Sequence, residues 1–281
     1  RESLTGLEFI ALPSGLFRMG QSEAEQAELL RVHGEEKYSQ WFLRELPPHV
    51  VSLEGFLMAR LPVTLGMFRE FVEQTLHVTD AEREGSSFGP GPGGWQERPG
   101  VNWRNPGFAQ GEDHPVVCVS WFDAMTFAGW LSRVTGRRLT LPSEAQWEYA
   151  CRAGTTTPFH LGPIIDAEQA NYDGSGVYGG GRKGINRRAT TPAGSFSPNP
   201  WGLFDMHGNV WEWCLDGFDD SFYTHPEATR PNPLCAHGTG YRVRRGGSWS
   251  YPPTYLRSAY RGRNHPDSRY VDIGFRLVCL P

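Results

Sequence analysis

The second half of the chain, after Gly154, is interrupted by glycine, proline, asparagine and aspartate at intervals too short for a helix of ordinary length. The whole chain holds 34 glycines and 22 prolines among 281 residues, and 10 tryptophans supply large rigid side chains for a core. The sequence therefore predicts short strands and long ordered loops rather than long regular elements. No repeat of fixed period and no break in composition divides the chain, so we expect a single domain over residues 1–281.

Regular elements are predicted mainly before Gly154. Residues 7–20 are typical of two short strands around a Pro-Ser-Gly turn, and residues 49–64 are also strand-like. Ser22 is placed to cap a helix that we expect to end at Gly34, and Thr64 to cap a helix over residues 65–74. Residues 85–100 are so rich in glycine and proline that we expect a surface loop there.

The two best-marked helices follow this loop. Ser120 precedes apolar residues at helical spacing, and Gly136 is expected to end this helix. Ser143 and Gln146 have the spacing of a capping box for a helix that ends before Gly154. We expect the apolar faces of both helices to belong to the core rather than to a cofactor site.

Charge and cysteine content exclude several classes of function. The net charge of −4 gives no general attraction to nucleic acid or to an anionic membrane. The five cysteines show neither CxxC spacing nor the Cys/His pattern of a zinc site, and their odd number favours a reducing compartment. No apolar run is long enough to span a bilayer, and no signal-peptide pattern opens the sequence.

Five phrases together resemble a known family. They are "GLFRMG", "HPVVCVSWFDAMTFAGWLS", "RLTLPSEAQWEYACRAG", "NPWGLFDMHGNVWEW" and "RRGGSW…LRSAYR…PD…IGFRLV". They occur in this order in the formylglycine-generating enzyme (sulfatase-modifying factor) family, which the chain resembles from about Leu7 to Val278. The resemblance implies a variant C-type lectin fold of the α+β class, with few helices, short antiparallel sheets and much irregular loop. This family hosts oxidases, sulfoxide synthases and non-enzymatic proteins, so the fold alone does not decide the function.

The residues needed for the family's oxidase chemistry are missing from their expected place. The resembling oxidases bind copper(I) through two cysteines that follow the Gly-Gly-Ser-aromatic motif, because copper(I) favours thiolate ligands. The corresponding stretch here, "GGSWSYPPTYLRSAYR", has no cysteine, and Cys279 lies beyond it. The clustered motif of an iron site, the nucleophile elbow and the phosphate-binding loop are absent too. We therefore expect a protein that is not an enzyme. The alternative is an enzyme or accessory of the sulfatase-modifying family that works without the copper cysteines.

The phrase "DMHGNVWEW" is the one candidate metal site. In the resembling enzymes it surrounds a calcium ion, which implies as ligands the side chains of Asp205 and Glu212 and the carbonyls of Gly208 and Val210. Alternatively, hydrogen bonds within the turn hold it, and the two tryptophans of the phrase anchor it in the core. The sequence leaves both readings open. We expect no required cofactor, with a structural calcium ion as the one candidate.

The closing segment, about residues 244–278, also resembles the variable region of diversity-generating retroelement proteins, which share this fold. In those systems, copying errors at template adenines turn Asn codons into codons that cannot encode Glu, Lys, Gln, Met or Trp. The segment alternates between scaffold residues, such as its glycines and Trp249, and twelve intervening positions. None of these five residue types occurs at the twelve intervening positions. These positions are the expected ligand-binding residues: Ser250, Tyr251, Tyr255, Tyr260, Gly262, Arg263, Asn264, His265, Ser268, Tyr270, Val271 and Asp272.

Tyrosines in such a segment suit a binding surface, because each offers a broad apolar face and a hydroxyl at a low entropic cost. We expect a variable protein that displays outward-facing side chains on a rigid frame and binds a macromolecule, in the first place a protein. Neither nucleic acid nor a membrane is an expected partner, and the location stays open between the cytoplasm and the surface of a cell or phage. The alternative for any one tyrosine is packing against its neighbours in a solvated loop.

Overall fold

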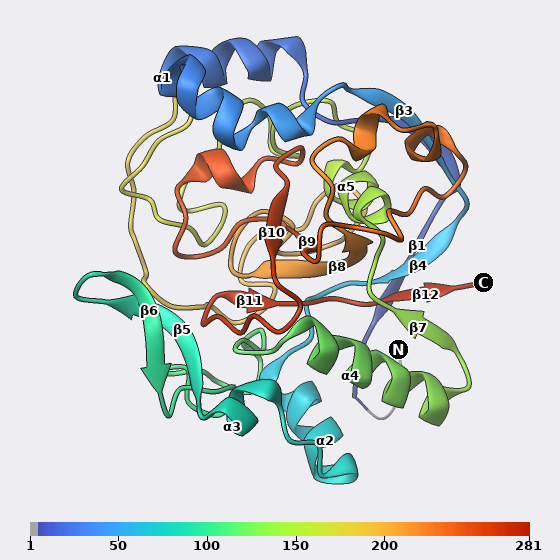
Figure 1. The fold of residues 1–281 in the computed structure, drawn as a ribbon, viewed down its shortest axis with the longest axis vertical. Helices are drawn as coiled ribbons and strands as arrows, with labels where there is room; N and C mark the ends of the chain where they lie inside the picture. Colours follow the sequence, from blue (N-terminus) through green and yellow to red (C-terminus); the bar gives the residue numbers. More distant parts are fainter. Residues whose placement is uncertain (1–4) are drawn as a thin grey trace.

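The computed structural model describes residues 5–281, and two four-stranded sheets lie at its centre (Figure 1). The first sheet has the order β1 (Phe9–Leu12), β4 (Phe56–Ala59), β12 (Val278–Leu280) and β7 (Arg138–Thr140), and its neighbours are antiparallel. Both β1 and β12 pair with β4. This sheet therefore holds strands from the two ends of the chain in one layer.

The second sheet carries the closing segment. Its order is β10 (Gly262–Asn264), β9 (Arg242–Arg245), β8 (Trp211–Gly217) and β11 (Ile273–Gly274). Strands β8 and β11 are parallel, whereas the other neighbours are antiparallel. Alternation along β8 puts Trp211 and Trp213 on one face, and both indole rings are fully buried. A smaller antiparallel pair joins β2 (Gly15–Met19) to β3 (His49–Leu53).

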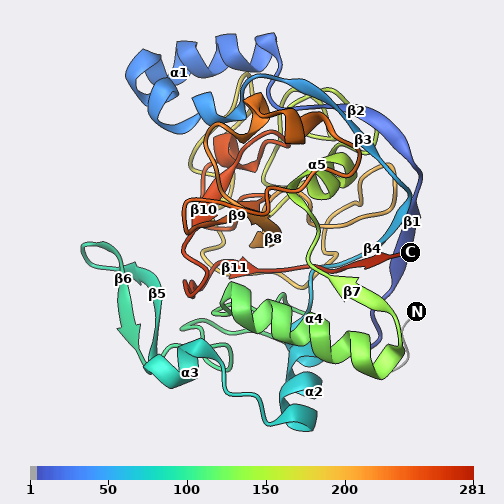
Figure 2. The same cartoon turned by 45° about the vertical axis from the view of Figure 1, so that its right-hand side comes forward.

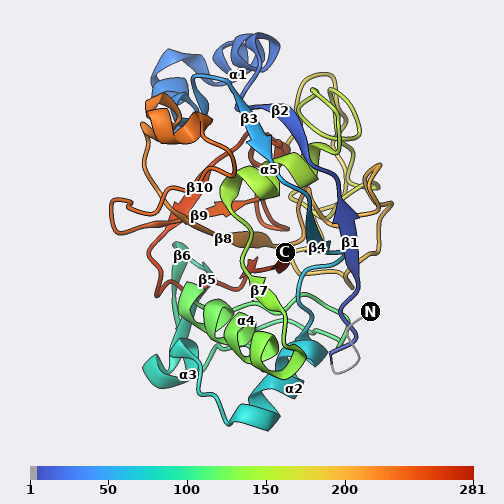
Figure 3. The same ribbon diagram turned by 90° about the vertical axis from the view of Figure 1, so that its right-hand side faces the viewer.

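The described residues form five α-helices: α1 (Glu23–Trp41), α2 (Leu65–Thr75), α3 (Asp80–Glu84), α4 (Trp121–Thr135) and α5 (Glu144–Arg152). Single turns of 3₁₀-helix add η1 (Leu43–Glu45), η2 (Phe222–Thr224), η3 (Pro226–Thr229) and η4 (Pro253–Leu256). Figures 2 and 3 show α1 at one end of the molecule and α2 and α4 at the other, with β8 and β9 between them. Within residues 5–281, no helix combines the length and apolar character needed to cross a membrane.

The predicted helix starts are confirmed. Ser22, Thr64, Ser120 and Ser143 each have extended backbone and accept a hydrogen bond from a backbone N–H of the first turn. After Gly154 the described chain contains only short strands and 3₁₀ turns, again as predicted. The α+β class expected from the sequence is therefore correct.

One local prediction is wrong and another is only partly right. Gly34 leaves the helical region, with φ 74° and ψ 168°, and ends the first helical segment as predicted, but a second helical segment follows it directly, so that α1 runs to Trp41. Tyr38 and Phe42, beyond the kink, are buried in the core. Residues 85–100 are not an irregular loop but a hairpin of β5 (Ser86–Gly91) and β6 (Gly94–Pro99). The backbone hydrogen bonds between β5 and β6 make this segment regular despite its many glycines and prolines.

Candidate functional site

The closing segment forms one side of a cleft of about 370 Å³, called here the C-terminal cleft. The other side comes from the end of α1 and from η1, which lie beside β10 in Figure 1. Seven predicted ligand-binding residues line the cleft: Tyr260, Gly262, Arg263, Asn264, His265, Ser268 and Tyr270. Sequence reasoning did not identify four further lining residues: Trp41, Arg44, Tyr241 and Arg244. Of these, only Arg244 lies in the segment that the sequence singled out.

The pairing of β10 with β9 sets the position of the Arg244 side chain. Gly262 lies opposite Arg244 in the ladder. A Cβ atom on Gly262 would approach Arg244 Cγ to 2.9 Å and Arg244 Nε to 3.2 Å, which is closer than an ordinary contact. Glycine at this position therefore leaves the room that the arginine side chain occupies.

Buried ion pairs fasten the closing segment to the opposite wall of the cleft. Arg257 is fully buried and donates to both carboxylate oxygens of Glu45, at 2.7 and 2.9 Å. Its Nη1 atom also lies 3.3 Å from a carboxylate oxygen of Glu25. Because Glu45 belongs to η1 and Glu25 to the first turn of α1, these contacts hold the segment against that wall.

A second set of pairs ties the same segment to α5. Arg261 donates to both carboxylate oxygens of Glu144 at 2.8 Å, and Arg245 pairs with Glu148 one turn further along the helix. Arginine is suited to such sites because its planar guanidinium makes two parallel bonds to a carboxylate. Together with Arg257, these arginines hold the backbone of the cleft in place.

The cleft is cationic. Among the described residues that line it none is acidic, whereas Arg44, Arg244 and Arg263 are arginines. Arg44 and Arg263 share one carboxylate, that of Asp220, at 3.6 and 3.1 Å. Burial lowers the pKa of the Arg44 guanidinium, which nevertheless stays protonated at neutral pH. The local field therefore attracts an anion although the whole chain is negatively charged.

Arg244 has an unusual environment. Its guanidinium lies over the Trp211 ring, 4.2 Å from the ring centroid, and one Nη atom donates to the Tyr251 hydroxyl at 3.4 Å. Its Nε is buried and has no hydrogen-bond partner. No carboxylate of residues 5–281 lies within 4 Å of this guanidinium. The arrangement leaves a cation in the cleft wall that an anionic ligand can satisfy.

An aromatic cluster lies beside this arginine. The rings of Tyr251 and Tyr255 meet nearly at right angles with centroids 5.4 Å apart, and those of Tyr255 and Tyr260 do so at 4.9 Å. Such edge-to-face contacts stabilise a fixed arrangement of rings. Burial raises the pKa of Tyr255 and Tyr260, so both phenols are neutral at physiological pH.

Four of the twelve predicted positions are buried, contrary to the expectation that all face outward: Tyr260, Gly262, Val271 and Asp272. Val271 packs in an apolar cluster with Trp249. The carboxylate of Asp272 accepts hydrogen bonds from Ser248 and Ser250, each at 2.7 Å. The side chains of Val271 and Asp272 therefore make contacts inside the fold rather than on its surface. The remaining eight are half-buried, apart from His265, which is exposed.

The predicted calcium ligands do not fit a calcium ion as they are arranged. Both carboxylate oxygens of Glu212 accept from the buried Arg276 guanidinium, at 2.6 and 2.7 Å, and one also accepts from the Trp147 indole at 2.7 Å. One oxygen of Asp205 accepts from the Gly194 N–H at 2.7 Å. The geometry therefore favours a turn held by hydrogen bonds and an internal cation, with Gly208 and Val210 as part of its backbone.

The cysteines do not fit copper(I) either. All five thiols are free and buried, and none lines the C-terminal cleft. Burial raises the pKa of the Cys118 and Cys151 thiols to about 12 and that of Cys235 to about 11. Such thiols stay protonated at neutral pH, whereas a copper(I) ligand must be a thiolate.

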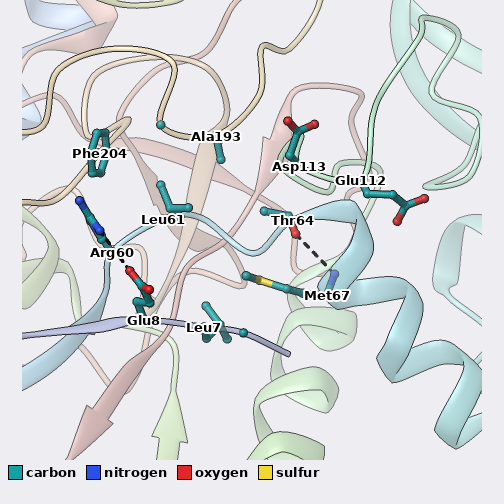
Figure 4. Close-up of a pocket in the computed structure, with 12 residues that line it drawn as sticks. Leu7, Glu8, Arg60, Leu61, Thr64, Met67, Glu112, Asp113, Ala193 and Phe204 are labelled. Carbon is teal, nitrogen blue, oxygen red and sulfur yellow. Dashed lines mark hydrogen bonds and ion pairs between the residues drawn. The ribbon is translucent and has the colours of Figure 1, made fainter. Parts of the chain in front are cut away.

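A larger pocket of about 570 Å³ shares no lining residue with the cleft. Figure 4 shows its apolar floor, with Leu61 and Met67, between two groups of charged side chains. Arg60 lies 3.1 Å from Glu8 within the pocket, and Glu112 lies 2.8 Å from Arg69, which is outside the lining, so both Arg60 and Glu112 already have a counter-charge. The C-terminal cleft, where no carboxylate of the described residues lies within ion-pair distance of Arg244, is the better candidate site.

Comparisons with known proteins agree with this fold. The sequence model of the protein family "Sulfatase-modifying factor enzyme 1-like domain" matches residues 1–280. The structure of PvdO from Pseudomonas aeruginosa superposes with a TM-score of 0.78 at 29% identity, covering 100% of this chain and 97% of PvdO. Treponema denticola variable protein 1 has the same fold, with a TM-score of 0.67 at 22% identity over 98% of this chain and 95% of its own. The variant C-type lectin fold expected from the sequence is thereby confirmed.

Curated relatives correct the expectation about enzymatic function. The formylglycine-generating enzyme of Streptomyces coelicolor is 35% identical over 83% of this chain and 81% of its own length. That of Thermomonospora curvata is 34% identical over 97% of this chain and 93% of its own length. Because enzymes match most of the chain at this level, the prediction that the protein is not an enzyme is wrong. The chain belongs to the formylglycine-generating enzyme (sulfatase-modifying factor) family.

Proposed function

We propose that this protein is an oxidase-like enzyme, or an enzyme accessory, of the sulfatase-modifying family that binds its substrate in the C-terminal cleft and works without a copper cysteine pair. The observation that carries the proposal is the cleft itself. It is built on the closing "RRGGSW…LRSAYR" phrase that marks the family, and seven residues chosen from the sequence converge on it.

The buried ion pairs support a substrate site at this place. A catalytic or binding site performs best when its groups are held in position before the substrate arrives. Arg257 and Arg261 tie the cleft backbone to η1 and α5 through bidentate contacts. The site is therefore held by rigid elements although most of its own backbone is irregular.

Oxidation of a cysteine-containing sulfatase peptide tests the proposal. Purified protein is incubated with the peptide in air with an excess of dithiothreitol, which supplies the second electron pair for the reduction of O₂ to water while the cysteine sulfur leaves as H₂S. The aldehyde product is measured by mass spectrometry after capture with a hydroxylamine. A peptide with serine in place of the cysteine is the control substrate. We expect aldehyde only from the cysteine peptide, at a rate that a copper(I) chelator leaves unchanged, because no thiolate pair lines the cleft. Absence of aldehyde from both peptides would refute the enzymatic half of the proposal.

Diversification of the closing segment is a second candidate property of the same surface. Its support is the set of half-buried residues beside the cleft, including Tyr251, Tyr255 and Ser250. The buried Val271 and Asp272 argue against it at their own positions, because a random replacement there would disturb the interior. A near-identical copy of the segment in the genome, with Asn codons at these positions and a reverse transcriptase beside it, would establish the property; a neighbourhood without the copy would exclude it.

A further inference from the structure

The lining of the C-terminal cleft points to one chemical class of ligand. We propose that the cleft binds an organic carboxylate that carries an aromatic ring, with the carboxylate at Arg244 and the ring among the aromatic side chains of the cleft. The inference rests on the proposed function in taking this cleft as the binding site, and it names the chemical group that the lining of the cleft recognises. It adds a specificity-determining residue, Arg244, which sequence reasoning had not singled out as a ligand-binding residue.

Arg244 differs from the other arginines of the closing segment that lie deep in the fold. The carboxylate of Glu148 neutralises Arg245, that of Glu45 neutralises Arg257, and that of Glu144 neutralises Arg261. Arg244 is half-buried and has no such partner within 4 Å among the described residues. Removing a charge from water without a hydrogen-bonded counter-charge is costly, and a bound carboxylate would offset that cost through charge-assisted hydrogen bonds.

An internal acid does not fill this role. Asp272 acts electrostatically on Arg244, but its carboxylate is not within ion-pair distance. It accepts hydrogen bonds at 2.7 Å from both Ser248 and Ser250 instead. These serines hold Asp272 in the interior, so Arg244 is left without an internal ion-pair partner where it lines the cleft.

Aromatic side chains make up much of the remaining lining: Trp41, Tyr241, Tyr260 and Tyr270. Tyr270 is held in place by stacking on Phe88, with centroids 5.1 Å apart and planes 22° from parallel. Rings that are already ordered bind another ring at a small entropic cost. A cleft of about 370 Å³ also lies in the usual range for small-molecule sites. The combination favours a planar aromatic acid over a bare inorganic anion.

A matched pair of probes tests this inference. N-acetyltyrosine and N-acetyltyrosinamide share the ring but differ in the charged carboxylate, and ligand-observed NMR titration of the full protein gives both dissociation constants. We expect the acid to bind roughly 10- to 100-fold more tightly than the amide, as for one hydrogen-bonded charge pair. The peptide Gly-Gly-Tyr with a free carboxylate distinguishes two sources of the same chemistry. Binding like that of N-acetyltyrosine indicates a peptide end, and binding of N-acetyltyrosine alone indicates a free acid; each supports the inference.

Two substitutions on the same strand locate the charge preference. Arg244→Gln should abolish the preference for the acid, whereas Arg244→Lys, which keeps the charge but not the planar fork, should retain part of it. Arg242→Gln is the control, because Arg242 lies over Trp121 at 4.0 Å and does not line the cleft. Near-UV circular dichroism checks that each variant is folded.

Equal affinity of the wild-type protein for acid and amide would overturn the inference, and so would a preference that survives in folded Arg244→Gln. Should Arg244→Gln fail to fold, the wild-type comparison and Arg244→Lys still decide. Neither result depends on turnover. A protein that prefers the acid but does not oxidise the sulfatase peptide would keep this inference and lose the enzymatic proposal, and the reverse result would do the opposite.

Discussion

Replacing Arg257 by methionine should destabilise this protein more than almost any other single change in the closing segment. The substitution keeps most of the side-chain volume but leaves Glu45 without its bidentate partner and Glu25 without a contact at 3.3 Å. Both carboxylates are buried, so their charges cannot be taken up by water. Breaking a buried pair in this way costs about 3–5 kcal/mol in the free energy of unfolding. For a chain of this size, that corresponds to a fall in melting temperature of roughly 6 °C or more.

Urea unfolding followed by near-UV circular dichroism measures this loss. The double variant Arg257→Met with Glu45→Gln should recover part of it, because it removes the charge that the single variant strands. The control is Arg31→Met, since Arg31 makes a bidentate pair with Glu28 at 2.7 and 2.8 Å on the exposed face of α1 and should contribute little. A similar small loss for Arg257→Met and Arg31→Met would refute the idea that buried ion pairs hold the cleft.

Three further predictions follow from other buried groups. Burial raises the pKa of Asp216 to about 7, above its unfolded value, so its contribution to stability is lost as the pH rises. From this group we expect the free energy of unfolding of the wild type to fall by about 1.4 kcal/mol between pH 6 and pH 8. Urea titrations at several pH values should show a flatter slope for Asp216→Asn. Because Arg276 already occupies both oxygens of Glu212, neither calcium nor a chelator should shift the melting temperature, and a rise of several degrees with calcium would show that the turn rearranges to bind it. Iodoacetamide at pH 7.5 should label no cysteine in the folded protein but all five in denaturant, since all five thiols are buried in the folded chain; rapid native labelling counted by mass spectrometry would contradict this.

Local signals in the sequence were sufficient for the helix starts and insufficient for the elements that depend on distant partners. The serine or threonine caps act within one turn, so their effect is visible in a short stretch of sequence. Gly34 ends the first helical segment of α1 as expected, but the second segment, up to Trp41, was not expected, because it depends on the burial of Tyr38 and Phe42 against distant parts of the chain. In the hairpin, β5 pairs with β6, and Phe88 of β5 makes backbone hydrogen bonds to Arg269 and Val271, which are distant in the sequence.

The sequence predicted the part of the candidate site that lies in the closing segment, but not the part that comes from distant elements. The pattern of fixed and variable positions in the closing segment located seven cleft residues. It could not show that Trp41 and Arg44, from the first part of the chain, complete the cleft, because no periodicity links them to the segment. Nor could it show that Asp272 turns inward to two serine hydroxyls. The sequence did not predict the arginine–glutamate pairs either, because the partners of Arg257 and Arg261 lie on elements that are distant in the sequence.

The rate of aldehyde formation in two tryptophan variants tests most directly whether the C-terminal cleft is the substrate site of an enzyme. Trp41 and Trp95 are similarly exposed, at 41% and 39%, but only Trp41 lines the cleft. With the cysteine-containing sulfatase peptide, Trp41→Ala should lower kcat/KM at least about 10-fold, as expected for loss of a buried aromatic contact with the substrate, while Trp95→Ala should match the wild type. Equal rates in the two variants, or no turnover by the wild type, would contradict the account.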